Sequence, residues 1–384
     1  MKPSLERLRD LAMAEPSIQR ELVAQWDPDE FSNLALSHAR AHGIDIAAQD
    51  LKFIPDPAGA ARFLPRPADG AQCPPPGWLP VSLTPSTGHL MVDWLCFDGI
   101  ATDAPFFHDA LSRARQRPFN RLFGWRMRLA DMLETSPQGP RPAGLIFHLS
   151  RCGSTLVHRM LGAGGSTNAL SEVSVFDETL QISLRPDVPA DDKLRLLRMM
   201  AAALGNAGAG KPLVLKLDAW HIQSWPLLRA AFPDTPAVFL CREPVEILVS
   251  QQRMRGIQAV PQPAMAALFG VGDYDAMSPD EYYAVLLAAS CRTATAAARD
   301  GALRVIGYGE LPQAVFTKIL PHFGLQADAA AQARMRDVAR FHSKSSDEHY
   351  VPDAEEKTRA AGAELRALVE RIAGPAYREL AAIA

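Results

Sequence analysis

The stretch Gly144–Leu161, "GLIFHLSRCGSTLVHRML", decides the fold of this chain. An apolar, strand-like run leads into a short loop that contains one glycine, and apolar residues at helical spacing follow the loop. A strand, a loop and the start of a helix form a common anion site, because the first amide groups of a helix are unpaired and its dipole favours negative charge there. We therefore expect a phosphate or sulfate group to bind at Arg151, Cys152, Gly153, Ser154 and Thr155.

The rest of the chain after about residue 141 alternates in the same way. Strand-like stretches at 143–149, 212–218, 236–242 and 303–308 are followed by helical stretches at 154–164, 225–232, 244–254 and 311–320. Such alternation with short connections predicts a parallel sheet covered by helices on both faces. The expected fold class is α/β, a P-loop-like three-layer sandwich over 141–384, with its ligands at the carboxyl ends of the strands.

A small domain and a linker with an accessory segment are expected before this one. Residues 1–54 predict a small helical domain, in which Asp27 suits an N-cap, Pro28 a first helical turn and Gly43 a helix stop. Residues 55–140 predict a linker and accessory segment. Nine prolines between Pro55 and Pro85 argue against regular structure there, and a strand at 89–99 and helix at 103–133 are expected after it.

Composition limits the function. A formal net charge of -3 argues against bulk nucleic-acid binding, which needs a broad basic surface. The five cysteines lie far apart without CxxC spacing, so neither a disulfide framework nor a zinc site is expected. The N-terminus has no apolar signal sequence, and no stretch approaches the apolar length of a membrane span. These features predict a cytoplasmic protein without a membrane span.

A second motif, "VFLCREPVEILVS", ends another apolar strand in Arg242. Ser250 follows on the predicted helix, so guanidinium and hydroxyl can bind one phosphate, although Arg242 could instead pair only with Glu246. A P-loop kinase would need a lysine after the loop glycine and an acidic residue ending a second strand to hold magnesium, and both are missing. We therefore expect no metal. A kinase-like phosphotransferase and a nucleotide-binding adaptor without catalysis remain alternatives.

In this order, "SRCGST" and "REPVEILVS" resemble the sulfotransferases that use 3′-phosphoadenosine 5′-phosphosulfate, and their style is similar to the bacterial and protein-tyrosine-type members. The resemblance covers about residues 143–350. It implies that the loop binds the 5′-phosphosulfate and that Arg242 and Ser250 bind the 3′-phosphate. The sequence departs from the family pattern at Ser150, where the family has a proline, and at Cys152, where it has a serine.

The same resemblance implies the catalytic residues. Glu172 matches the carboxylate base, with Asp177 and Glu178 as rivals, and Lys216 matches a lysine that neutralises charge on the leaving oxygen, as Arg151 also would. His148 and His158 are expected to be core or surface residues instead.

Further implied contacts lie near the C-terminus, with Tyr308 beside the adenine and Ser343 and Lys344 closing over the nucleotide. The acceptor is left open among peptides, carbohydrates and small molecules. The N-terminal helical domain resembles nitrogen-fixation-type leader-peptide domains, and the sequence does not indicate its role.

Overall fold

The structure is a computed structural model that describes residues 3–51, 73–102, 105–135, 140–206, 208, 210–341 and 354–384. The chain forms two compact units. The first comprises Met1–Gly139 and Val173–Gly210, and the second comprises Pro140–Glu172 and Lys211–Ala384. The domain boundaries expected after residues 54 and 140 stay predictions.

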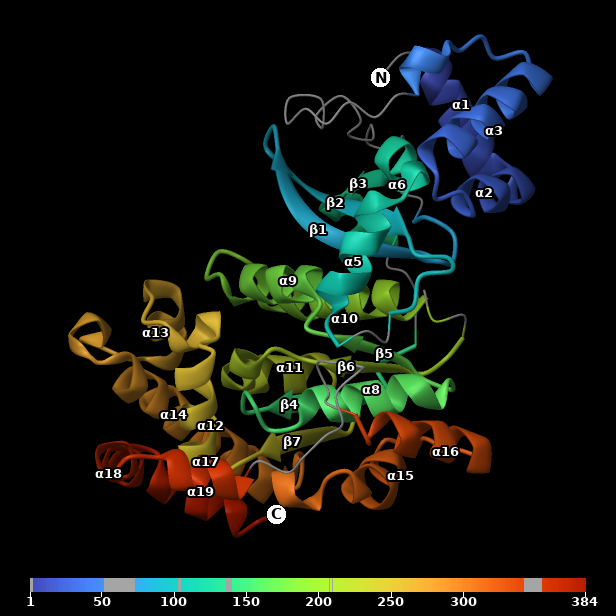
Figure 1. Cartoon of the computed structure of the whole chain (residues 1–384). Helices are drawn as coiled ribbons and strands as arrows, with labels where there is room; N and C mark the ends of the chain where they lie inside the picture. The colour runs from blue at the N-terminus through green and yellow to red at the C-terminus, as the bar shows by residue number, and fades with distance from the viewer. Residues whose placement is uncertain are drawn as a thin grey trace. The chain divides into compact units, whose positions relative to one another are not determined.

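The second unit is built on a five-stranded parallel sheet in the order β5-β6-β4-β7-β8 (Figure 1). Its strands are β4 (Gly144–His148), β5 (Asn168–Ser171), β6 (Leu213–Lys216), β7 (Ala237–Cys241) and β8 (Arg304–Gly307). Every residue of the central strand β4 is buried, as expected for a strand with neighbours on both sides. The predicted α/β fold with a parallel sheet flanked by helices is confirmed.

Helices connect and cover these strands. The helices nearest the site are α8 (Ser154–Gly164), α11 (Trp225–Ala231), α12 (Pro244–Arg253), α13 (Pro263–Phe269) and α14 (Pro279–Arg299), with short 3-10 turns η3 (Ala219–Ser224), η4 (Ile257–Ala259), η5 (Tyr274–Ala276) and η6 (Tyr308–Glu310). The helix expected at 311–320 contains a π-helical turn, η7 (Val315–Ile319). The remaining helices are α15 (Leu320–His322), α16 (Ala329–Val338), α17 (Ala354–Ala360), α18 (Ala363–Ile372) and α19 (Gly374–Ala381).

The first unit begins with three helices, α1 (Pro3–Ala14), α2 (Pro16–Val23) and α3 (Pro28–Ala41), and a 3-10 turn, η1 (Ala48–Asp50). The Asp27 side chain accepts hydrogen bonds from the amides of Asp29 (2.8 Å) and Glu30 (3.0 Å), which confirms the predicted N-cap of α3. Gly43 follows the helix with φ +66°, in the left-handed region typical of a helix stop.

An antiparallel sheet, β1 (Trp78–Ser86), β2 (His89–Cys96) and β3 (Trp125–Arg128), forms the second part of this unit. The helices packed with it are α5 (Phe107–Gln116), α6 (Pro118–Phe123), α7 (Leu129–Thr135), α9 (Ser174–Leu184) and α10 (Ala190–Asn206). The strand predicted at 89–99 is confirmed by β2.

Two expectations for this region were wrong. The helix expected at 103–133 is interrupted by β3, which pairs with β2 and joins it through an ion pair of Arg126 Nε with Asp93 Oδ1 at 2.5 Å. The proline-rich segment was expected to lack regular structure, but it contains β1. This strand lies at the edge of the sheet and pairs with β2 alone, and its register shifts between Pro80 and Ser82. The missing amide of proline is tolerated at such a position. Residues 52–72 of that segment lie outside the described residues.

Within the described residues, no helix combines the length and apolar character needed to cross a membrane.

Candidate active site

The loop between β4 and α8 has the backbone geometry of an anion cradle. Arg151 has φ +62°, and Gly153 has φ +83° at the N-cap of α8, so the chain turns sharply before the helix begins. A Cβ atom on Gly153 would lie 2.7 Å from Leu311 Cδ1 and 3.1 Å from Tyr308 Cδ2. Only glycine fits here without displacing those side chains. Ser154 and Thr155 occupy the first turn of α8, where their amides and hydroxyls can donate to an anion.

Cys152 is a buried member of this loop. Its thiol donates a hydrogen bond to the carbonyl oxygen of Leu149. Burial raises the pKa of Cys152 to about 12, so the side chain is a neutral thiol at ordinary pH. A neutral, buried thiol is a poor nucleophile.

The second predicted motif meets the first in space. The guanidinium of Arg242, directly after β7, lies over the ring of Tyr308, 3.9 Å from its centroid. Its Nη1 donates to the carbonyl oxygen of Arg151 at 3.3 Å. The Tyr308 ring packs against Gly153 and leaves no room there for a side chain. Gly153, Arg242 and Tyr308 come from three separate stretches of the sequence. They thus lie together at the carboxyl ends of β4, β7 and β8.

The ion pair weighed as an alternative role for Arg242 is also present. Arg242 Nε lies 2.6 Å from Glu246 Oε2 on α12, and the arginine is 4% exposed. A buried guanidinium needs such a partner, since an uncompensated buried charge is costly. Ser250 follows Glu246 by one helical turn and is half-buried. The pair therefore orients Arg242, and binding of a phosphate by Arg242 and Ser250 stays a prediction.

The two predicted catalytic residues lie at the ends of adjacent strands. Ser171 on β5 is in register with Lys216 on β6, and Glu172 follows Ser171 directly. Lys216 is 2% exposed, donates to Ser171 Oγ at 3.2 Å and forms an ion pair with Glu172. The Glu172 amide donates to the carbonyl oxygen of Lys216 at 2.8 Å, and Glu172 has φ +52°. This unusual backbone conformation directs the carboxylate to the lysine.

Electrostatics keep this carboxylate ionised. Burial alone would raise the pKa of Glu172, but the charge of Lys216 and contacts with His148 outweigh burial and hold that pKa far below its ordinary value. His148 was expected to be a core or surface residue, and it is indeed buried. However, its Nε2 lies 3.6 Å from Glu172 Oε1 as well as 2.9 Å from the carbonyl oxygen of Leu217. Burial and Lys216 lower the pKa of His148, so its ring is neutral.

Sequence reasoning missed the contact of His148 with Glu172. Its only signal was a polar residue at the end of the otherwise apolar strand β4. His158, on α8, is 1% exposed and is a core residue, as expected.

Asp177 lies in the first turn of α9 and Glu178 follows it. In this first unit, Glu178 accepts a hydrogen bond from the Leu83 amide at 2.6 Å. The choice of Glu172 over these rivals stays a prediction. The Arg151 side chain donates through Nη2 to the carbonyl oxygen of Met254 at 2.7 Å, beyond α12. Ser343 and Lys344 lie outside the described residues.

No protein-family model matches the chain. No curated protein matches it either. Several solved structures do, all weakly. The sulfotransferase domain from the curacin biosynthetic pathway is 15% identical, with a TM-score of 0.37 over 61% of this chain and 98% of that domain. Sulfotransferase STF1 from Mycobacterium tuberculosis is 17% identical, with a TM-score of 0.36 over 72% of this chain and 89% of the other. Sulfotransferase STF9 from Mycobacterium avium is 14% identical, with a TM-score of 0.38 over 68% of this chain and 84% of the other.

Proposed function

We propose that this chain is a sulfotransferase, which moves the sulfuryl group of 3′-phosphoadenosine 5′-phosphosulfate to a hydroxyl or amine acceptor. The observation that carries the proposal is the position of Arg242. This cation ends β7, where a kinase would place an acidic residue, and it lies beside Tyr308 at the glycine loop. Two motifs that both favour anions therefore meet at one edge of the sheet.

The residues present fit such a nucleotide. The loop amides, the Ser154 and Thr155 hydroxyls and the guanidinium of Arg151 are donors suited to the phosphosulfate. Arg242 and Ser250 are suited to the 3′-phosphate, and Tyr308, whose ring stacks with Arg242, is suited to line the adenine side. When bound, the nucleotide supplies a sulfur atom whose bond to the 5′-phosphate oxygen breaks as the acceptor oxygen attaches to it.

The chain's own residues handle the proton and the charge. Glu172 accepts the proton of the acceptor hydroxyl, while Lys216 and Arg151 stabilise the negative charge that develops on the departing phosphate oxygen. The products are the sulfated acceptor and adenosine 3′,5′-bisphosphate. Because Lys216 lowers the pKa of Glu172 in the free protein, sharing the lysine's charge with the departing oxygen raises that pKa. Glu172 then becomes a better base at the step that needs one.

The test is calorimetric titration with adenosine 3′,5′-bisphosphate, with 5′-AMP and with magnesium-ATP. We expect selective binding of the bisphosphate and a loss of about 10- to 100-fold in affinity in Arg242→Ala, the size of one charged hydrogen-bonded contact. Arg299→Ala is the matched control, because Arg299 pairs with Glu379 on the surface of the same unit. Thermal unfolding of each variant checks that it is folded.

Arg242→Ala leaves the Glu246 carboxylate without its partner, so the double variant Arg242→Ala/Glu246→Ala is measured as well. It should lose the same affinity while remaining folded. Binding of magnesium-ATP at least as tight as the bisphosphate would support the kinase alternative. Bisphosphate binding without product from any acceptor would support the adaptor.

A further inference from the structure

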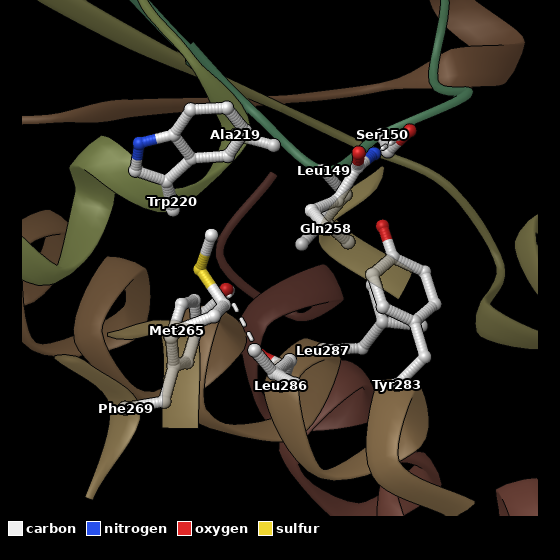
Figure 2. Close-up of a pocket in the computed structure, with 11 residues that line it drawn as sticks. Leu149, Ser150, Ala219, Trp220, Gln258, Met265, Phe269, Tyr283, Leu286 and Leu287 are labelled. Carbon is white, nitrogen blue, oxygen red and sulfur yellow. Dashed lines mark hydrogen bonds between the residues drawn. The ribbon is translucent and has the colours of Figure 1, made fainter. Parts of the chain in front are cut away.

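A pocket in the second unit lies beside the loop and plays no part in the nucleotide contacts above (Figure 2). Its walls are mostly apolar. Trp220, Met265 and Phe269 are grouped on one side in Figure 2, and Leu149, Leu286 and Leu287 also line it. The pocket is partly open to solvent. None of the described residues that line it is charged.

The polar lining groups are already hydrogen-bonded to the protein. Ser150 Oγ accepts from Gln258 Nε2 at 3.1 Å and from Gln251 Nε2 at 3.2 Å. The Tyr283 hydroxyl interacts with the same group, and burial raises the pKa of Tyr283 to about 12, which keeps it protonated. Ser290 donates to the Leu286 carbonyl oxygen at 2.9 Å. A ligand rich in hydroxyls or charges would find few partners here, and its desolvation would not be repaid.

Several residues that line the pocket are close in sequence to the proposed catalytic residues Arg151 and Lys216. Leu149 and Ser150 follow β4 and directly precede Arg151, while Ala219 and Trp220 follow Lys216 at the end of β6. The polar side of the pocket, at Ser150, is therefore the side next to the anion loop. An acceptor whose hydroxyl points to Ser150 would present it toward the sulfuryl group.

Apolar surface continues outside the pocket in the sequence around Gln258. Met254, Ile257 and Val260 are 68%, 73% and 46% exposed, which is unusual for such residues. Arg151 binds the Met254 carbonyl oxygen, so this segment is tied to the loop. Both the exposed side chains of Met254, Ile257 and Val260 and the apolar walls of the pocket favour an apolar ligand.

We propose that this pocket binds the acceptor and selects an uncharged, apolar small molecule with a single hydroxyl, in preference to a peptide or a carbohydrate. The inference rests on the proposed sulfotransferase function and names the substrate class of that site. Trp220, Met265 and Phe269 supply the apolar surface, and the group of Ser150, Gln258 and Tyr283 orients the hydroxyl.

The probe is 2-naphthol, titrated by its fluorescence against the full-length protein saturated with adenosine 3′,5′-bisphosphate. Met265→Glu places a charge in the pocket, and Ala267→Glu places the same charge on the exposed side of the same helix, α13. We expect binding to the wild type, a loss of about 10-fold or more in Met265→Glu and little change in Ala267→Glu. Glucose at high concentration should not displace the probe. Bisphosphate affinity should be equal in both variants.

Failure of either proposal has its own signature. Bisphosphate binding together with no 2-naphthol binding, or equal 2-naphthol binding in the two variants, would overturn the acceptor pocket and leave the sulfotransferase proposal standing. Displacement by glucose would overturn the apolar class. If 2-naphthol bound through Met265 while the bisphosphate did not bind at all, the proposed function would fail, and the role of the pocket as an acceptor site with it.

Discussion

The guanidinium of Arg242 lies 3.9 Å from the centroid of the Tyr308 ring, so the ends of the neighbouring strands β7 and β8 form one stacked pair. A cation over an aromatic ring is stabilised by the electron density of the ring face. The ring also holds the guanidinium in place beside the loop. Tyr308 therefore orients Arg242, in addition to its predicted place beside the adenine.

This pairing predicts a difference between two substitutions of Tyr308. Tyr308→Phe keeps the ring and should retain bisphosphate affinity within about 2-fold. Tyr308→Leu removes the ring and should weaken affinity by about 3- to 30-fold, the range of a partly buried cation–π contact. Calorimetry on both proteins measures the difference. Equal affinities in the two variants would show that the ring contributes nothing to binding.

The second prediction concerns Glu172 and Lys216. Glu172→Gln should bind the bisphosphate within about 2-fold of wild type but lose about 100-fold or more in turnover, because the proposed general base is lost. Lys216→Met should also lose turnover, since the leaving oxygen is no longer neutralised. Release of the bisphosphate in the presence of an accepted hydroxyl compound provides the assay.

Asp177→Asn and Glu178→Gln are the comparison variants for that experiment. They carry the same chemical change on carboxylates of α9. If either of them lost as much turnover as Glu172→Gln while remaining folded, the base would be assigned to the wrong carboxylate.

A pH dependence of stability follows from the same ion pair. The pKa of Glu172 in the folded protein lies below its ordinary value of 4.5. The unfolded chain therefore binds a proton that the folded chain does not, and the stabilisation is fully present above that ordinary value and is lost as pH falls below it. Urea unfolding at about pH 7 and about pH 3 should show a larger loss in wild type than in Glu172→Gln. Parallel losses in the two proteins would contradict the low pKa.

Gly153 gives a fourth prediction. Gly153→Ala adds a Cβ at φ +83°, only 2.7 Å from Leu311 Cδ1 and 3.1 Å from Tyr308 Cδ2. We expect a loss of about 1–3 kcal/mol in the free energy of unfolding and weaker bisphosphate binding as Tyr308 shifts. Gly301→Ala is the control, because Gly301 has φ +71° with no atom within 4 Å of the added Cβ. Gly301→Ala should lose stability only through the strained backbone conformation of alanine at this φ. Only Gly153→Ala should weaken bisphosphate binding.

Local pattern was sufficient to predict four strands of the parallel sheet, the glycine turn after β4 and the N-cap at Asp27, because residues close together in the chain mark each of them. It missed the short edge strand β5 (Asn168–Ser171). It failed where distant partners decide the structure. The strand β3 forms in a segment with helical character because β2 offers it a paired edge, and Arg126 finds Asp93 there. β1 forms despite Pro80 because that residue falls at a shift in register.

In the candidate site, too, the sequence indicated single residues but not the contacts between them. The motifs identified Arg242, Glu172 and Lys216 one at a time, yet nothing in the sequence showed that Glu172 and Lys216 are ion-paired or that His148 touches the carboxylate. Both contacts depend on the order of strands in the sheet, which places β5, β6 and β4 side by side. The predicted roles of these residues in catalysis stay predictions.

The buried thiol of Cys152 has a consequence for oxidative stress. Peroxides and alkylating reagents attack the thiolate, and with a pKa of about 12 almost none is present at this position. A sulfinic acid in the loop would add negative charge where we propose that the anionic group of the nucleotide binds. Because burial keeps the sulfur protonated and shielded, we expect slow oxidation of Cys152, and treatment of the folded protein with hydrogen peroxide should leave bisphosphate affinity unchanged.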